Sequence, residues 1–89
     1  MTRYRVSEHA LSAVLQEGTV LLHLHTKRYY TLNETGAAVW ELIEQGVSRE
    51  EMVPRLTETF DVDPATAETE VDRLVRELSA ELLISVEEG

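Results

Sequence analysis

The chain has 89 residues, a length that suits one domain covering residues 1–89. It contains no cysteine, which excludes a disulfide framework, a cysteine-based metal site and a cysteine nucleophile. The first basic residues are followed by no apolar stretch of the signal-peptide kind, and apolar residues nowhere run for the roughly 20 positions of a membrane span. The cytoplasm is therefore the expected compartment, and no membrane partner is expected.

Charge is unevenly divided along the chain. The formal net charge is −9, and residues 34–89 hold fifteen acidic against four basic side chains. An acidic surface repels phosphate groups, whose neutralisation supplies most nucleic-acid affinity. A partner of basic or neutral character fits better, and the alternative that the acidic surface serves only solubility stays open.

The first third of the chain has the character of short strands joined by tight turns. Three runs rich in apolar and β-forming residues occupy positions 11–16, 19–25 and 28–32. The pairs Glu17-Gly18 and Thr26-Lys27 separate these runs as hairpin turns. Links this short predict an antiparallel three-stranded meander whose first and third strands are the edges.

Helical spacing begins after the third run, where apolar residues start to recur every three or four positions. Asn33 is a suitable cap for a first helix, Gly46 a suitable end, and Trp40, the only tryptophan, is expected to anchor the core. Ser48 and Glu51 have the spacing of a capping box and predict the start of a second helix.

The third helix begins sharply, with Asp63 as its cap and Pro64 at its first position. The apolar residues that follow form one stripe, which consists of Ala67, Val71, Leu74, Leu78 and Leu82. The last residues, 87–89, are expected to be frayed. Strands followed by helices predict an α+β fold, a winged helix-turn-helix-like domain with a three-stranded antiparallel sheet and three helices.

No pattern in the sequence supports catalysis or a metal site. His23 and His25 would point the same way from a strand, but zinc needs three or four ligands and nothing positions His9 as another. The favoured interpretation is two histidines on a solvated strand face. No serine has the context of a nucleophile elbow, and the scattered glycines make no phosphate-binding loop. The protein is therefore expected to be no enzyme and to need no cofactor or metal.

A winged helix also allows a DNA-binding interpretation. A recognition helix carries Lys and Arg toward phosphates and base edges. Here the region 64–82 has two arginines against five acidic residues. Nucleic acid is therefore not expected as a partner.

The pattern favours recognition of an extended peptide. An edge strand presents unpaired N–H and C=O groups, which a peptide can complete as an added strand. Residues 28–32 lead directly into the helices, so this edge should form a groove with the third helix. The candidate peptide-binding residues are Arg28, Tyr29, Tyr30, Thr31 and Leu32 on the strand and Glu68, Asp72, Val75, Arg76 and Ser79 on the helix. The alternative that these are ordinary strand and helix residues stays open.

The segment RYYTLNETGAAVWEL, residues 28–42, resembles the PqqD family. The hallmark of that family is an aromatic strand, then Leu-Asn-x-Thr-Gly, then a helix with an aromatic residue, and the resemblance extends over residues 10–84. It implies a domain that binds the leader of a ribosomally made precursor peptide as an added strand, between the third strand and the third helix. Such a domain presents the precursor to a modifying enzyme.

Small acidic members of this family are most similar to the recognition proteins of lasso-peptide biosynthesis, which implies a leader protease and a cyclase as further partners. The alternative is a true PqqD protein of pyrroloquinoline quinone biosynthesis, which partners a radical-SAM enzyme.

Two positions depart from the family pattern. Glu81 stands where members often have a glycine, and Pro54 should remove a hydrogen bond from the second helix or delay its start. A monomer is expected, and exchange of first strands would be the route to a dimer.

Overall fold

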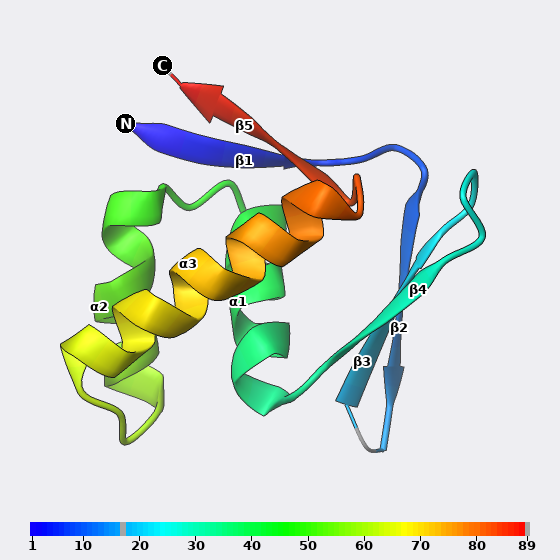
Figure 1. Ribbon diagram of the computed structural model, residues 1–89. Coiled ribbons are helices and arrows are strands. Elements are labelled where there is room, and N and C mark those ends of the chain that lie inside the picture. Colours follow the sequence, from blue (N-terminus) through cyan, green and yellow to red (C-terminus); the bar gives the residue numbers. More distant parts are fainter. Residues whose placement is uncertain (17, 89) are drawn as a thin grey trace.

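The computed structural model describes residues 1–16 and 18–88 (Figure 1). The helices are α1 (Glu34–Glu44), α2 (Arg49–Thr59) and α3 (Pro64–Ala80). The strands are β1 (Thr2–Val6), β2 (Ala10–Leu15), β3 (Gly18–His23), β4 (Tyr29–Leu32) and β5 (Ile84–Glu88). Within this described part, none of the helices combines the length and the apolar character needed to cross a bilayer.

Strands β2, β3 and β4 form an antiparallel sheet in that order, so the predicted meander is confirmed, with β2 and β4 as its edges. Gly18 opens β3 with a φ of 140°. A Cβ there would lie 2.5 Å from the carbonyl oxygen of Leu32, so this position needs glycine for both its backbone conformation and its close approach to β4. The expected turn at Glu17 and Gly18 includes Glu17, which lies outside the described residues.

A second sheet joins the two ends of the chain, and the sequence did not predict it. β1 pairs antiparallel with β5, with Thr2 opposite Glu88 and Val6 opposite Ile84. The prediction of a frayed tail was therefore wrong for residues 87 and 88, because β1 supplies a hydrogen-bonding partner that local periodicity does not reveal. Gly89 lies outside the described residues.

Side-chain caps start α1 and α3 as predicted. Asn33 Oδ1 accepts a hydrogen bond from Gly36 N at 2.8 Å, and Asp63 Oδ1 accepts one from Thr66 N at 3.2 Å. The bond from Thr66 also lowers the pKa of the Asp63 carboxyl below its ordinary value. α1 ends before Gly46, which has a φ of 79°.

The predicted capping box at the start of α2 was wrong. The Ser48 side chain is 1% exposed and its hydroxyl has no partner among the described residues. Its backbone carbonyl instead accepts a hydrogen bond from Glu51 N at 3.0 Å, because the side chain is turned into the interior. Pro54 does not delay α2, which begins at Arg49; it lies exposed within the helix and leaves one backbone acceptor without its usual donor.

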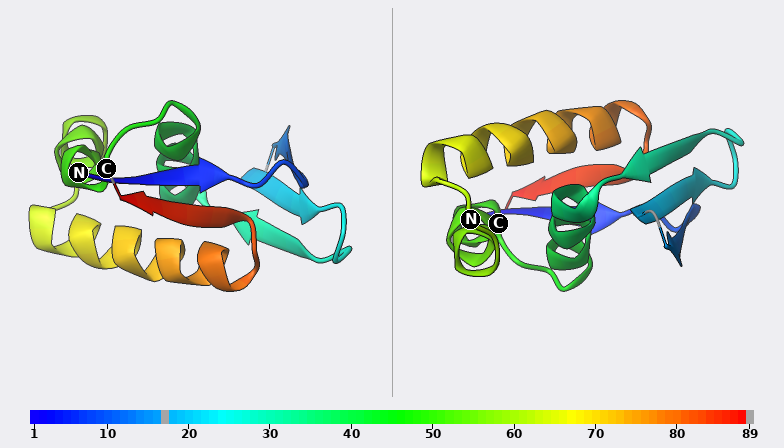
Figure 2. Two further views of the ribbon diagram at one scale, coloured as in Figure 1. Left: turned by 90° about the horizontal axis from the view of Figure 1, so that it is seen from above. Right: turned by 90° about the horizontal axis from the view of Figure 1, so that it is seen from below.

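α1 occupies the centre of the fold, in contact with β1, β3, β4 and both other helices. α1 packs on one face of the β2–β3–β4 sheet, and α3 runs beside β5 (Figures 1 and 2). Leu21 and Leu32 point toward the helices and are buried, as is Trp40, the expected core anchor. Tyr29 lies on the opposite face of the sheet and is 72% exposed. This arrangement leaves the β4 edge beside α3.

Candidate functional site

The edge of β4 has free backbone groups at alternate residues. His23 N donates a hydrogen bond to Arg28 O at 2.9 Å, which makes this a hydrogen-bonded pair of the β3–β4 ladder. Bonded and non-bonded pairs alternate along an antiparallel ladder, so Tyr30 also bonds to β3. The N–H and C=O groups of Tyr29 and Thr31 therefore point away from β3, toward the free edge.

A pocket of about 320 Å³ lies between this edge and α3, at the place where the sequence predicted a groove. It is lined by Tyr30, Thr31, Leu32, Asn33, Gly36, Arg73 and Leu74. Leu32 and Leu74 are buried and form an apolar floor. Of the five predicted strand residues, the structure thus brings three to the pocket, while Tyr29 faces the outer side of the sheet.

Two polar contacts join β4 to α3 beside this pocket. The Tyr30 hydroxyl donates a hydrogen bond to the Glu77 carboxylate. Nearer the start of β4, Arg28 Nε lies 3.1 Å from Glu81 Oε1. These contacts hold the edge strand at a fixed place relative to the helix.

Arg73 supports the first of these contacts from within α3. Its guanidinium donates to Glu77 Oε2 at 2.8 Å and to Glu70 Oε2 at 2.9 Å. The hydrogen bonds from Tyr30 and Arg73 hold the pKa of the Glu77 carboxyl below its ordinary value. Partial burial and the bond to Glu77 raise the pKa of Tyr30 above its ordinary value. At neutral pH a charged carboxylate therefore meets a protonated phenol, as the hydrogen bond requires.

Four of the five predicted helix residues lie on a face of α3 other than the one beside β4. Asp72 and Glu68 pair with α2, because Arg49 Nη2 lies 2.7 Å from Asp72 Oδ1 and 3.8 Å from Glu68 Oε1. Helical spacing puts Val75 and Ser79 on the same face as Asp72. Val75 packs there against the core, and the Ser79 hydroxyl is buried.

The helical period is the physical reason for this difference in placement. Neighbouring residues of an α-helix are separated by about 100° of rotation. The apolar stripe of α3 therefore has a polar border on each side, and the sequence does not say which of the two borders faces β4. Arg73 and Glu77 form the border beside β4, whereas Asp72 belongs to the other border. Arg76 is exposed. It lines neither the pocket beside β4 nor the pocket that contains Arg49 and Asp72.

His23 also departs from its predicted place on a solvated strand face. Its side chain is 5% exposed, because it shares the face of β3 that points toward the helices. Its Nδ1 accepts hydrogen bonds from His25 N at 3.1 Å and Thr26 N at 3.2 Å, which fixes the β3–β4 turn. His9 stacks on His25 with ring centroids 4.9 Å apart.

Within residues 1–16 and 18–88, no group of three or more potential ligand side chains is arranged to hold a metal ion.

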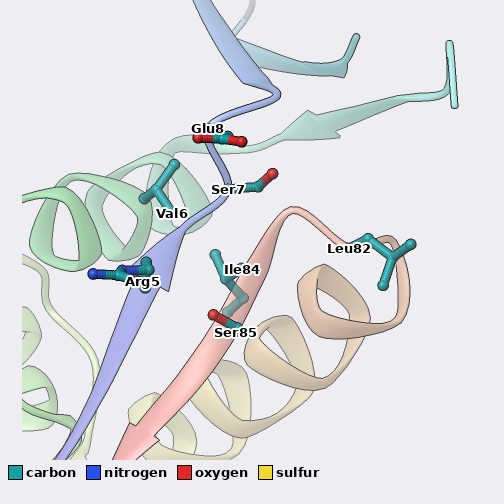
Figure 3. A pocket seen from close by; sticks show the side chains of 7 residues that line it. All are labelled: Arg5, Val6, Ser7, Glu8, Leu82, Ile84 and Ser85. Carbon is teal, nitrogen blue, oxygen red and sulfur yellow. The ribbon is translucent and has the colours of Figure 1, made fainter. Parts of the chain in front are cut away.

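A larger pocket, of about 660 Å³, lies at the corner where β1, β5 and the end of α3 meet (Figure 3). We call it the corner pocket; it is lined by Arg5, Val6, Ser7, Glu8, Leu82, Ile84 and Ser85. The sequence analysis missed it, because its walls come from opposite ends of the chain. The one sequence signal is Leu82, which ends the apolar stripe but lies beyond the last turn of α3.

Comparison with known proteins places these features in a family. The family model for coenzyme PQQ synthesis protein D (PqqD) matches residues 18–84. No curated protein matches the chain. A solved structure described as "TbiB1 in Complex with the TbiA(beta) Leader Peptide" is 32% identical, with a TM-score of 0.83 over 91% of this chain and 94% of that chain.

A second solved structure, described as "Lasso peptide synthetase B1 complexed with the leader peptide", is 25% identical. Its TM-score is 0.84 over 93% of this chain and 98% of that chain. The family match spans most of the sequence, and both structures match more than nine-tenths of this chain. The chain belongs to the PqqD family.

Proposed function

We propose that this protein binds the leader of a ribosomally synthesised precursor peptide as an added strand on β4, and that it does so in lasso-peptide biosynthesis. The observation that carries the proposal is the free edge of β4, which lies beside an apolar-floored pocket shared with α3. Both similar structures are described as leader-peptide complexes, and one of them as a lasso peptide synthetase B1.

The peptide backbone pairs with the free N–H and C=O groups of Tyr29 and Thr31. Since successive side chains of a strand point to opposite faces, alternate leader residues enter the pocket above Leu32 and Leu74. The intervening ones lie on the outer face beside Tyr29. Backbone pairing supplies much of the affinity, and the pocket supplies the preference for particular side chains.

Charge in the groove favours apolar leader side chains at the inward positions. Glu77 is engaged by Tyr30 and Arg73, and Glu81 by Arg28, so the charges beside the pocket are already paired. An inward charged residue would have to break these pairs or remain without a partner, and both are costly. A neutral or basic leader also suits the net charge of −9.

In this proposal the protein is an adaptor and not an enzyme, and it delivers the bound precursor to a leader protease and a cyclase. A second candidate is presentation of a precursor to a radical-SAM enzyme in pyrroloquinoline quinone biosynthesis, which the name of the matching family favours. Gene neighbours separate the two: protease and cyclase genes support the first, and a radical-SAM gene supports the second.

Fluorescence polarisation with the labelled leader of the adjacent precursor gene tests the binding, which we expect to be submicromolar. Methylation of backbone nitrogens along the leader should abolish binding at alternate residues, because only those N–H groups face β4. Equal tolerance at every position would contradict strand addition, and absence of binding would contradict the proposed function.

A proline substitution at the edge gives a test from the protein side. Thr31→Pro removes an N–H that points to the free edge and leaves the β3–β4 hydrogen bonds in place, so it should weaken leader binding while the circular dichroism spectrum is kept. The matched control is Ser12→Pro on the other edge. The bond from Leu24 N to His9 O sets the alternation of the β2–β3 ladder, so the N–H of Ser12 also points outward. This control should bind the leader normally.

A further inference from the structure

Leu82 combines a disfavoured backbone conformation with an exposed apolar side chain. Its φ is 61°, in the left-handed region that residues other than glycine and asparagine seldom adopt. Its side chain is 62% exposed. Just past a helix, glycine is the usual residue for this conformation. Leucine is thus unfavourable here on two counts, and a residue kept under such strain is a candidate for a functional role.

Leu82 forms one wall of the corner pocket. Figure 3 shows Leu82 on the turn after α3, Ile84 on β5, and Val6, Ser7 and Glu8 along the end of β1 and the link that follows it. The pocket therefore combines an aliphatic part, formed by Val6, Leu82 and Ile84, with a polar part that has Arg5 and Glu8 at its exposed rim. Its volume of about 660 Å³ falls within the range of roughly 300–1,000 Å³ that is typical of ligand pockets.

The charged groups on the rim are exposed and lie beside other polar side chains. Arg5 Nε lies 3.1 Å from Glu87 Oε1, and His9 Nε2 lies 3.7 Å from Glu8 Oε1. An apolar ligand group would leave both contacts intact, whereas a charged group would compete with them. The chemistry of the pocket thus favours an aliphatic side chain.

The corner pocket lies next to one end of the β4 groove. Arg28, immediately before β4, pairs with Glu81, and Glu81 immediately precedes Leu82. The Ser7 and Glu8 side of the pocket is also held near Arg28. His9, which follows Glu8, accepts a hydrogen bond through its backbone oxygen from Leu24 N at 2.8 Å, and Leu24 lies in the link between β3 and β4. A peptide strand that follows β4 toward Arg28 therefore leaves the sheet beside the corner pocket.

We propose that the corner pocket is a second subsite for the precursor peptide, and that it holds an aliphatic side chain from the segment just outside the part paired with β4. This inference rests on the proposed function. The four residues of β4 pair with only about 13 Å of extended peptide, so a subsite beyond the strand adds both affinity and selectivity. Leu82 is the wall that contacts the aliphatic group.

The test compares the full leader with shortened leaders, and the parent protein with three variants. The peptides are the full leader encoded by the adjacent precursor gene and a set shortened from either end toward the part that pairs with β4. Leu82→Gly and Leu82→Asn remove the aliphatic wall and suit the left-handed backbone, so the turn is kept. The control is Val86→Thr, since Val86 is 53% exposed on β5 and does not line the corner pocket.

Both Leu82 variants should bind the full leader about tenfold more weakly than the parent protein, as expected for one lost aliphatic contact. Their melting temperatures should equal or exceed that of the parent, because strain is relieved. One of the shortened leaders should bind all four proteins equally. If the Leu82 variants bind the full leader as the parent does, the subsite is disproved while the proposed function stands. If the parent binds no leader, both proposals fail.

Discussion

The hydroxyl of Tyr30 donates a hydrogen bond to the carboxylate of Glu77, and this contact ties the edge strand β4 to α3 beside the peptide groove. The two residues are far apart in sequence, so the bond fixes the relative position of two elements that the chain itself does not hold together. Together with the Arg28–Glu81 ion pair, this bond between a phenol and a carboxylate helps to set the width of the groove.

Removal of the Tyr30 hydroxyl should loosen this junction. Tyr30→Phe keeps the ring and loses the hydrogen bond, so the free energy of unfolding should fall by about 1 kcal/mol. For a domain of this size that corresponds to a melting temperature lower by roughly 4–8 °C, which a thermal melt measures. Tyr29→Phe is the control, because the Tyr29 side chain is exposed on the outer face. Equal shifts in the two variants would contradict a structural role for the Tyr30–Glu77 bond.

The lowered pKa of Glu77 predicts a pH-dependent contribution to stability. A carboxyl with a lower pKa in the folded state stabilises the protein above its ordinary pKa of 4.5, and this stabilisation is lost as the pH falls through the folded-state pKa. Glu77→Gln should therefore be less stable than the parent at neutral pH, and the difference should shrink as the solution is acidified below the ordinary pKa.

Urea unfolding at a series of pH values from neutral to strongly acidic measures that difference. Glu44→Gln, on the exposed side of α1, is the control and should follow the parent throughout the series. A difference for Glu77→Gln that stays constant with pH would mean that the charge of the carboxylate is not what stabilises the contact.

Neighbouring residues on α3 should differ in their effect on leader binding. Arg73 lines the pocket beside β4, whereas Asp72 pairs with Arg49 on another face. Arg73→Gln should weaken binding roughly threefold to tenfold, the equivalent of about one hydrogen bond. Asp72→Asn should leave the affinity unchanged. Fluorescence polarisation compares them, and the opposite ranking would restore the helix wall expected from the sequence.

Two glycines with positive φ should respond differently to alanine. At Gly46 no described atom lies within 4 Å of the added Cβ, so Gly46→Ala should cost only the backbone strain, about 1 kcal/mol. At Gly18 the Cβ would lie 2.5 Å from the backbone oxygen of Leu32, so β4 itself must move.

Gly18→Ala should therefore destabilise the fold by more than about 2 kcal/mol and also weaken leader binding. Chemical denaturation and leader titration measure the two effects. Similar stability losses in the two variants would indicate that β3 and β4 separate easily at this point.

The sequence predicted those features that depend on neighbouring residues. The caps at Asn33 and Asp63 are of this kind, since a side chain and an amide three residues later are enough to define them. The meander follows equally from short links between strands. These local signals were sufficient for the fold class and for the edge strand of the site.

Features that depend on distant contacts were not predicted. The β1–β5 sheet joins residues from opposite ends of the chain, and the corner pocket depends on that pairing. Which polar border of α3 faces β4 also depends on contacts between distant elements, since Asp72 pairs with Arg49 of α2 while Arg73 lies beside β4. The burial of His23 likewise depends on which face of β3 the helices cover.

The β1–β5 ladder has a consequence for synthesis of the protein on the ribosome. The strand Thr2–Val6 is made well before its partner, Ile84–Glu88, so it stays unpaired until residues 84–88 have been added. Closing so long a loop carries an entropic cost, and contacts of high sequence separation form slowly. The β2–β4 hairpins can form while the chain is still growing. The corner pocket takes shape only after residues 84–88 have emerged from the exit tunnel.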